Sequence, residues 1–201
     1  NCLVVAASER HRLAATPQPG LYFRGGANGF IAKFIRYVGQ AAQAASAPHK
    51  AINALNAACL GIMAMHAQRE TFQDQDSIRV HPIITKGGEI VNNVPADVHL
   101  ETYVRGRSLE AILDASRKVD RAFRAGGDAV GAETHIRDVP GYLPICQDEA
   151  LSEIAEQNGR ALLGDAGAQV AAFMTASTDM GDISHLMPAM HPFVGGTEGL
   201  L

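Results

Sequence analysis

The chain has 201 residues, of which 47% are apolar and 19% are charged, and its formal net charge is −4 at pH 7. This composition is ordinary for a globular protein, and the chain is long enough to bury a core in one large domain or two small ones. The slight acidic excess argues against a general binder of phosphate backbones, so we expect no nucleic-acid partner. The longest apolar run, at 57–65, has the length of a core helix. We therefore expect no membrane partner.

The ends of the chain and its cysteines give a second set of expectations. The chain begins with Asn1 and ends at Leu201 after a glycine-rich stretch, which we interpret as the ends of a fragment. Cys2, Cys59 and Cys146 form no Cys-x-x-Cys pair, so neither a thiol–disulfide motif nor a structural zinc site is predicted. Cys59 lies among apolar neighbours and is predicted to be a small buried residue. A reducing, cytoplasmic location is the default for such a chain.

Apolar periodicity predicts four strands and two helices between a glycine-rich seam at 24–29 and a proline-rich seam at 138–144. In chain order they are a strand at 30–38, a helix from 53 to about 68, a strand at 78–84, a strand at 98–104, a helix that starts after Ser108 and stops at Gly126-Gly127, and a strand within 128–138. The helix from 53 is apolar on more than one face, which indicates a buried helix. The order β-α-β-β-α-β is that of a ferredoxin-like sandwich. The predicted fold class is therefore α+β, as an α/β sandwich.

The segments outside these seams carry a different pattern. A short strand is predicted at 2–6, Asp148 is expected to cap a helix that Gly164 ends, and 170–175 is expected to form a short buried strand. We therefore predict that the ferredoxin-like unit is inserted between two pieces of another domain. The predicted domains are a first piece at 1–26, the ferredoxin-like unit at 27–138, and a second, C-terminally incomplete piece at 139–201.

Three stretches resemble sequences of one enzyme family. They are GQAAQAASAPHKAINALNAA at 39–58, GGEIVNNVPADVHLETYVR at 87–105 and STDMGDISHLMPAMHP at 177–192. Small residues fill the first stretch, so we expect another backbone or a ligand to approach it closely. Together the stretches resemble the aminoacylase/carboxypeptidase G family of metal-dependent amidohydrolases, and in particular its p-aminobenzoyl-glutamate hydrolase-like branch.

The resemblance implies a catalytic domain with two divalent metal ions, zinc or manganese, and an inserted ferredoxin-like lid through which the protein forms a homodimer. The implied reaction is attack of a metal-activated water on the amide of a small molecule with a carboxylate. Such substrates are N-acyl amino acids, aminobenzoyl-glutamate-like amides or dipeptides. The family's histidine-rich metal motif and paired glutamates are not found in this chain, so we expect it to hold no complete metal site by itself. The metal ligands are left unassigned.

The resemblance also assigns lid residues. Asn92 and Arg105 match positions that engage the substrate carboxylate, partly across subunits, and a guanidinium can bind a carboxylate through two parallel hydrogen bonds. The alternative is a surface arginine paired with Glu101 or Asp97, and an asparagine that only serves a turn. Gln43 stands where the family has a histidine that stabilises the oxyanion. A glutamine amide can donate a hydrogen bond there, but it carries no charge and shuttles no proton.

The third stretch offers two interpretations. Asp179, Asp182 and His185 are spaced three residues apart, with His191 nearby, and such ligands suit zinc or manganese. The family places no metal ligand at these positions, however, and the aspartates could equally cap a helix or stabilise a turn. We therefore favour a substrate-lining role for this stretch. The expected substrate-lining residues are Ser177, Thr178 and Asp179.

Two other functions compete with amide hydrolysis. One is a non-catalytic dimerisation or carboxylate-binding module that keeps only the lid surface. The other is an RNA-binding ferredoxin-like domain, which is disfavoured because the strands are expected to lack stacking aromatic residues and a basic face.

Overall fold

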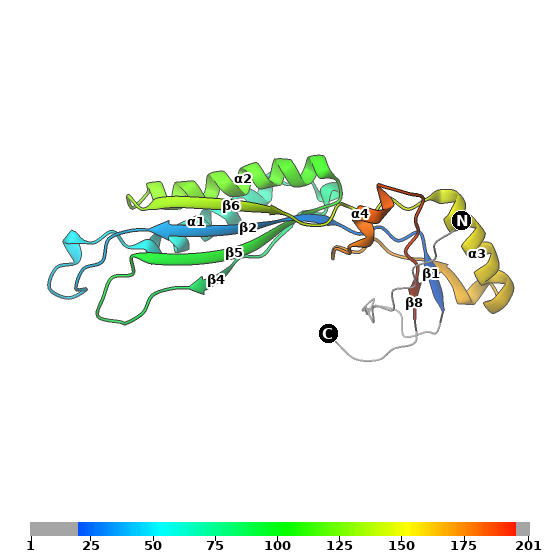
Figure 1. Ribbon diagram of the computed structural model, residues 1–201, viewed down its shortest axis with the longest axis horizontal. Helices are drawn as coiled ribbons and strands as arrows, with labels where there is room; N and C mark the ends of the chain where they lie inside the picture. Colours follow the sequence, from blue (N-terminus) through cyan, green and yellow to red (C-terminus); the bar gives the residue numbers. More distant parts are fainter. Residues whose placement is uncertain (1–19, 196–201) are drawn as a thin grey trace. The chain divides into compact units, whose positions relative to one another are not determined.

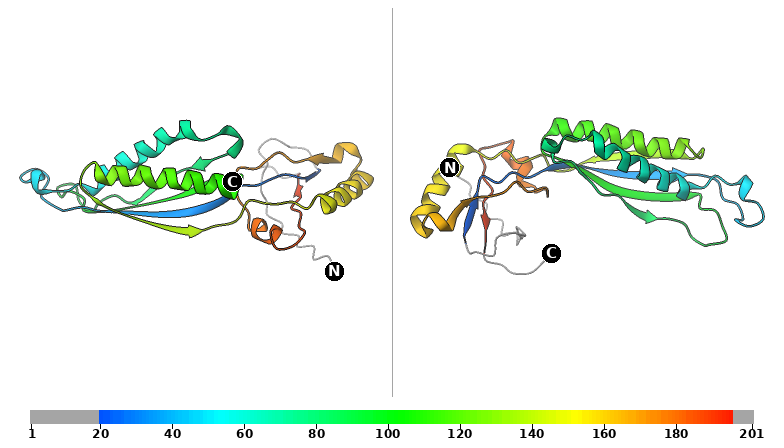
Figure 2. Two further views of the ribbon diagram at one scale, coloured as in Figure 1. Left: turned by 90° about the horizontal axis from the view of Figure 1, so that it is seen from above. Right: turned by 180° about the vertical axis from the view of Figure 1, so that it is seen from behind.

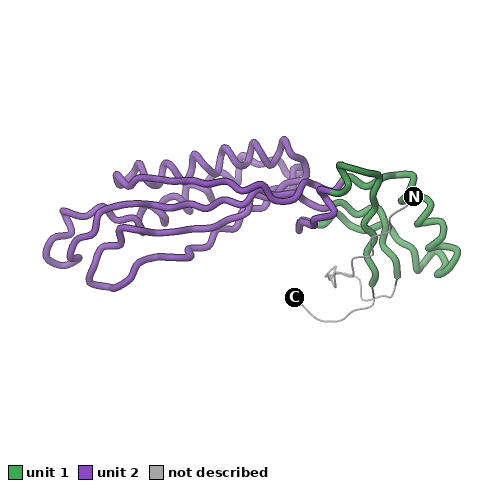
Figure 3. The backbone as a smooth tube through the Cα atoms, viewed as in Figure 1, with its two compact units in different colours: residues 1–26, 146–174, 183–201 green, residues 27–145, 175–182 purple. Residues whose placement is uncertain are grey.

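The computed structural model describes residues 20–195, so the strand predicted at 2–6 lies outside the described residues. The chain divides into two compact units (Figure 3). Unit 1 combines the residues up to 26 with 146–174 and those from 183 onward. Unit 2 combines 27–145 with the short segment 175–182.

Unit 2 is a sheet with two helices on one face (Figures 1 and 2). Strands β2 and β6 are neighbours, β5 lies on the other side of β2, and β3 and β4 both pair with β5, always antiparallel. In chain order, leaving out the short 3-10 turns, the elements are β2 (Gly29–Val38), α1 (Ala54–Ala67), β3 (Arg79–Val80), β4 (Ile83–Lys86), β5 (Asp97–Gly106), α2 (Leu109–Asp128) and β6 (Glu133–Pro140). The α+β class is confirmed, and so is the predicted β-α-β-β-α-β order, except that the second predicted strand is divided into β3 and β4.

The core of unit 2 lies between the sheet and the two helices. Alternate residues of β2 and β5, such as Ile35, Tyr37 and Leu100, point to the helices and are almost fully buried. The Tyr37 hydroxyl donates a hydrogen bond to the Phe123 carbonyl of α2 at 2.6 Å, and burial raises the pKa of this tyrosine. The other residues of β2 and β5 point to the face without helices, which we call the open face of the sheet.

The prediction that Gly126 and Gly127 stop the second helix is wrong, because α2 runs through both glycines to Asp128. A Cβ at Gly126 would overlap the backbone of Gly61 and Ala57 on α1. The glycine therefore allows the two helices to approach closely, rather than ending one of them. The apolar pattern can be recognised in the sequence, but the need for glycine at this position is visible only once α1 and α2 are packed together.

Four other predicted features differ in the structure. The strand predicted at 78–84 is divided into β3 and β4, because Pro82 between them cannot donate a hydrogen bond to the sheet. The strand predicted at 170–175 is instead β7 (Ala168–Val170), whose last two residues are exposed. Helix α1 is buried on one face only, and the Met63 side chain is 67% exposed. Cys59 is also exposed, so the prediction of a buried cysteine is wrong.

Lys33 of β2 is a charged residue inside unit 2, with a side chain that is 0% exposed. Its Nζ donates to Asp120 of α2 at 2.6 Å and to Asp138 of β6 at 2.8 Å. Two carboxylates on different elements thus compensate one buried charge, and they tie α2 to the sheet.

Unit 1 is a small three-stranded sheet with a helix. Strand β1 (Leu21–Phe23) pairs in parallel with β7 and antiparallel with β8 (Phe193–Val194). Helix α3 (Glu149–Leu163) begins as predicted, since the Asp148 side chain accepts a hydrogen bond from the Leu151 amide at 2.8 Å. The helix ends at Gly164, whose φ of 73° favours glycine. In the described part of the chain, no helix has the length and apolarity needed to cross a membrane.

Candidate functional site

Arg105, near the end of β5 on the open face, is held by contacts on several sides. Its guanidinium carbon lies 5.4 Å from the ring centre of Phe30 and 5.2 Å from that of Tyr103. Its Nη1 donates a hydrogen bond to the Ser177 Oγ at 2.8 Å. The side chain is therefore oriented by two aromatic faces and one hydroxyl, which fixes the direction of its remaining N–H groups.

The charge of Arg105 has no carboxylate partner among residues 20–195. The alternative pairing with Asp97 fails because that carboxylate binds Arg36 at 2.6 Å and Lys86 at 2.9 Å, and Glu101 makes no ion pair with Arg105 either. Burial lowers the pKa of Arg105, while the neighbouring Tyr103 opposes this effect. A guanidinium remains protonated in proteins. The structure therefore presents a half-buried positive charge, which suits an anionic ligand.

Segment 175–182 reaches the sheet through Asn28, a residue that the sequence analysis did not single out. Asn28 is fully buried, and its side-chain nitrogen donates to the carbonyls of Ser77 at 3.0 Å and Thr175 at 3.2 Å. Its backbone amide donates to the carbonyl of Ala176 at 3.0 Å. These bonds place Ser177 beside Arg105. In the sequence, the only sign that Asn28 holds segment 175–182 was the presence of an asparagine in the glycine-rich stretch before β2.

The three residues predicted to line the substrate cleft have different environments. Ser177 contacts Arg105, as described above, and Asp179 is exposed. Thr178 is buried, and its hydroxyl accepts a hydrogen bond from the Met180 amide at the start of α4 (Met180–Ser184). Only Ser177 and Asp179 are therefore accessible from solvent.

Gln43 and Asn92 lie together in a pair of loops at the opposite end of β5. The loops are joined by a bridge between Gln43 and Asn93 and by the Ala44 amide, which donates to the Asn92 carbonyl at 2.9 Å. The Gln43 Oε1 accepts hydrogen bonds from the amides of Ala45 and Ser46 at 2.7 and 2.5 Å. The glutamine carbonyl thus stabilises its own turn, and its Nε2 makes no hydrogen bond to the described residues. Asn92 is exposed.

The structure does not bring Asn92 and Arg105 together within one chain. Arg105 lies eight residues beyond Asp97, the first residue of β5, and the loop with Asn92 precedes that residue. At the rise of an extended strand this corresponds to about 27 Å. No side chain of this kind spans such a distance, so one copy of the chain cannot present both residues to one small carboxylate.

No group of three or more histidine, cysteine, aspartate or glutamate residues in the described part of the chain could hold a metal ion. Asp182, a member of the predicted alternative cluster, instead accepts a hydrogen bond from the Leu143 amide at 2.8 Å. The described residues therefore do not fit the metal ions that the family implies.

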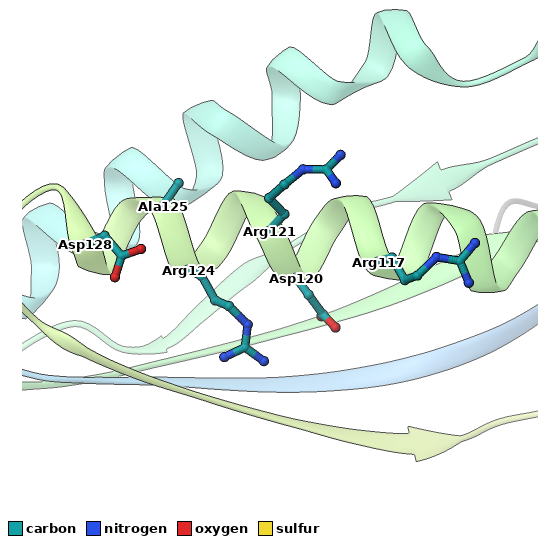
Figure 4. A pocket seen from close by; sticks show the side chains of 6 residues that line it. All are labelled: Arg117, Asp120, Arg121, Arg124, Ala125 and Asp128. Carbon is teal, nitrogen blue, oxygen red and sulfur yellow. The ribbon is translucent and has the colours of Figure 1, made fainter.

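A hollow on α2 is lined by residues outside the predicted site (Figure 4). Arg121 points away from the sheet there, whereas Arg124 and Asp120 point toward it. The side chains do not converge on one point, and Asp120 is already bound to Lys33. This hollow is not built as an anion site. The lining residues are Arg117, Asp120, Arg121, Arg124, Ala125 and Asp128.

The argument against RNA binding assumed that the strands lack stacking aromatic residues, and the open face shows that this assumption is wrong. Phe30, Phe34 and Tyr103 lie on it, and the guanidinium carbon of Arg137 lies 4.5 Å from the ring centre of Phe34. The guanidinium groups of Arg105 and Arg137 contact these rings, so the chain itself occupies part of the aromatic surface that nucleic-acid bases would need for stacking.

Comparison with known proteins shows what the chain as a whole is similar to. No family model matches the chain. The Xaa-Arg dipeptidase of Mus musculus is 31% identical over 170 residues, which cover 83% of this chain and 39% of that protein. The fold is similar to that of aminopeptidase PepT from Bacillus cereus, with a TM-score of 0.70 at 18% identity, over 87% of this chain and 46% of that one. It is also similar to that of an aminobenzoyl-glutamate utilization protein from Klebsiella pneumoniae, with a TM-score of 0.65 at 19% identity, over 84% and 43%.

The matched proteins include a dipeptidase and an aminopeptidase, which by their names act on peptide bonds. These comparisons support the metallo-amidohydrolase family that the sequence resemblance indicated. The chain spans less than half the length of the relatives that it matches.

Proposed function

We propose that this chain contains the substrate-binding lid of a metal-dependent amidohydrolase that cleaves N-acyl amino acids, aminobenzoyl-glutamate-like amides or dipeptides. Unit 2 is the lid in this proposal, and unit 1 is part of the catalytic domain. The intact protein uses two divalent metal ions, zinc or manganese, held by residues other than those described here. Bound metal ions of this kind activate water and polarise the amide carbonyl. The mouse relative's name favours dipeptides among the three substrate classes.

The observation that carries the proposal is the environment of Arg105. Two aromatic rings and the Ser177 hydroxyl fix its guanidinium, and no carboxylate in the described part of the chain neutralises it. A pre-oriented guanidinium binds a carboxylate with little loss of conformational freedom. Arg105 therefore holds the substrate carboxylate, and Ser177 keeps the guanidinium directed toward it. Asp179, exposed on the same short segment, borders the bound substrate.

Asn92 and Gln43 act from a second subunit in this proposal. In their own chain they lie beyond Asp97, the first residue of β5, which is itself about 27 Å from Arg105 along the strand. In a homodimer the distance within one chain does not matter, because the loops of one lid can reach the substrate that Arg105 of the other subunit holds. Asn92 then contributes a hydrogen bond to the carboxylate. The Nε2 of Gln43 donates to the developing oxyanion, as a neutral substitute for the family's histidine.

The edge of the sheet supports the homodimer. Among the strands that the structure describes, none pairs with the outer side of β4, and Ile83 and Ile84 on this strand are exposed. Leu60 and Met63 are exposed on α1. An uncovered strand edge with apolar side chains readily pairs with a second copy of the same edge. We infer that these residues lie in the subunit interface.

A cytoplasmic location is part of the same proposal. Cys59 and Cys146, the two cysteines among the described residues, are free and exposed. Exposed thiols are common in proteins from reducing compartments. This observation supports the location without depending on the proposed reaction.

The experiment is a metal and turnover assay on the intact protein. Metal content is measured after purification, and hydrolysis is followed with a dipeptide panel, N-acetyl amino acids and aminobenzoyl-glutamate, each with its C-terminal amide as control. We expect about two metal ions per subunit and cleavage of substrates with a free carboxylate. A protein that holds no metal and cleaves none of these after addition of zinc or manganese would contradict the proposal.

The same assay separates the second candidate function. A non-catalytic lid that only binds carboxylates is favoured by the same Arg105 geometry. It predicts binding of N-acetyl amino acids that Arg105→Met abolishes, without turnover of any substrate in the presence of metal.

A further inference from the structure

A second arginine faces Arg105 across the sheet. Strands β3 and β5 are antiparallel, and their register places Arg79 directly opposite Arg105. Residues directly opposite each other in such a pair lie on the same face of the sheet. The next pair, Val80 and Val104, is buried against the helices, which places both arginines on the open face.

Two like charges at this spacing repel each other, and cross-strand pairs of this kind are destabilising. Arg79 is exposed, and its Nη1 donates to the Ile78 carbonyl at 2.9 Å. Neither Arg79 nor Arg105 forms an ion pair with a carboxylate anywhere in 20–195. Two neighbouring positive charges are thus uncompensated by any carboxylate of the described residues.

The surroundings favour binding of an organic anion over a solvated patch. Tyr103 beside the arginines is 48% exposed, and the centre of the Phe30 ring lies 4.7 Å from the centre of its ring. Tyr142 meets Phe30 edge to face at 5.4 Å and is also partly exposed. Apolar aromatic surface next to the guanidinium groups excludes water from one side of a bound carboxylate, which strengthens each charged hydrogen bond.

We propose that Arg79 is a second substrate-binding residue, which shares the substrate carboxylate with Arg105. This inference rests on the proposed function for the identity of the ligand as a substrate, but not for the existence of the anion site. Arg105 supplies the oriented hydrogen bonds, and Arg79 supplies further N–H donors and a second positive charge from the adjacent strand. The site selects molecules with a free carboxylate attached to an apolar or aromatic group.

The test measures binding to the intact protein with a probe that is not hydrolysed. The probe is 3-phenylpropionate, and its neutral control is 3-phenyl-1-propanol, both titrated by calorimetry at low salt. We expect the acid to bind and the alcohol to bind at least tenfold more weakly. Arg79→Met should weaken binding of the acid by about tenfold, and Arg79→Lys by less, since it keeps the charge. Raising the salt concentration should weaken binding less in Arg79→Met than in the unmodified protein.

Arg121→Met is the matched control, because it removes an exposed arginine from α2 on the other side of the sheet. It should leave binding unchanged, and thermal unfolding of each variant shows whether the fold is kept. The inference is wrong if folded Arg79→Met binds 3-phenylpropionate within twofold of the unmodified protein, or if the unmodified protein does not distinguish acid from alcohol. Binding as expected without turnover would instead contradict the proposed function alone.

Discussion

Replacement of Arg105 by methionine is the most direct perturbation of the proposed site. Methionine keeps an unbranched apolar stem that can still contact Phe30 and Tyr103, but it loses the charge and the hydrogen bond to Ser177. The sheet should therefore remain folded, because the guanidinium group lies half-buried on the open face and is not part of the buried core. Any loss of activity can then be assigned to substrate binding.

The expected magnitude follows from the geometry. Each hydrogen bond to a charged group contributes about 1.5–3 kcal/mol. The side chain is only half-buried, so we take about 3 kcal/mol in total for a carboxylate bound through two N–H groups. This corresponds to a loss of about two orders of magnitude in kcat/KM. The loss should be mainly in KM, because the carboxylate is bound equally in the ground state and the transition state.

The assay is steady-state hydrolysis of one dipeptide and of its C-terminal amide by the intact protein. The unmodified protein should prefer the acid, and Arg105→Met should cleave both substrates equally slowly. Arg105→Lys should recover only part of the loss, because an ammonium cannot bind a carboxylate with a planar fork or stack in the same way on two rings. If Arg105→Met retains the KM and the preference for the acid, the assignment of Arg105 to the substrate carboxylate is refuted.

Three further variants test other parts of the structure. Gln43→His in the intact enzyme should raise kcat more than it changes KM, because an imidazolium stabilises an oxyanion better than an amide does; an unchanged kcat would show that the position is idle. Gly126→Ala should destabilise unit 2 by about 1–3 kcal/mol in thermal unfolding, because its Cβ would overlap the backbone of α1, whereas Gly87→Ala, with ordinary contact distances, should cost less. Arg36 and then Lys86 hold the pKa of Asp97 well below its usual value of 3.8, so the stabilisation is complete above about pH 4 and is lost as the pH falls below it. Asp97→Asn should reduce this acid sensitivity, measured as the unfolding midpoint between pH 7 and pH 2, and equal acid sensitivity in both proteins would contradict the role of the carboxylate.

Much of unit 2 could be predicted from local patterns in the sequence. Apolar and polar residues alternate in β2 and β5, and α2 has a single apolar stripe. These patterns indicated which faces are buried, because the apolar residues of a strand or helix recur with the period that brings them to one face. Asp148 and Gly164 predicted both ends of α3, since capping is a local interaction. The pattern of α1 was misleading. Its apolar residues on two faces suggested full burial, but only one face meets the sheet.

The candidate site was only partly predictable. The resemblance named Arg105 and Asn92 at the spacing of the family motif. Residue spacing does not show that eight residues of extended strand, about 27 Å, separate Arg105 from the start of β5, with Asn92 in the loop before it. Asn28 gave almost no signal, because its role depends on the carbonyls of two segments that are distant in sequence. The pairing of Arg79 with Arg105 is set by strand register, which a single strand does not encode.

The sequence by itself determined the order of the elements, their apolar faces and the caps of α3, because each of these depends on residues within a few positions of one another. The tertiary structure alone decided why Gly126 must be glycine, why Cys59 is exposed and which charges lie together. Each of these depends on atoms brought in by another element, such as the backbone of α1 beside Gly126 or strand β3 beside Arg105. Contacts between distant segments leave no periodic pattern in the sequence, so they can be seen only when the sheet and helices are packed.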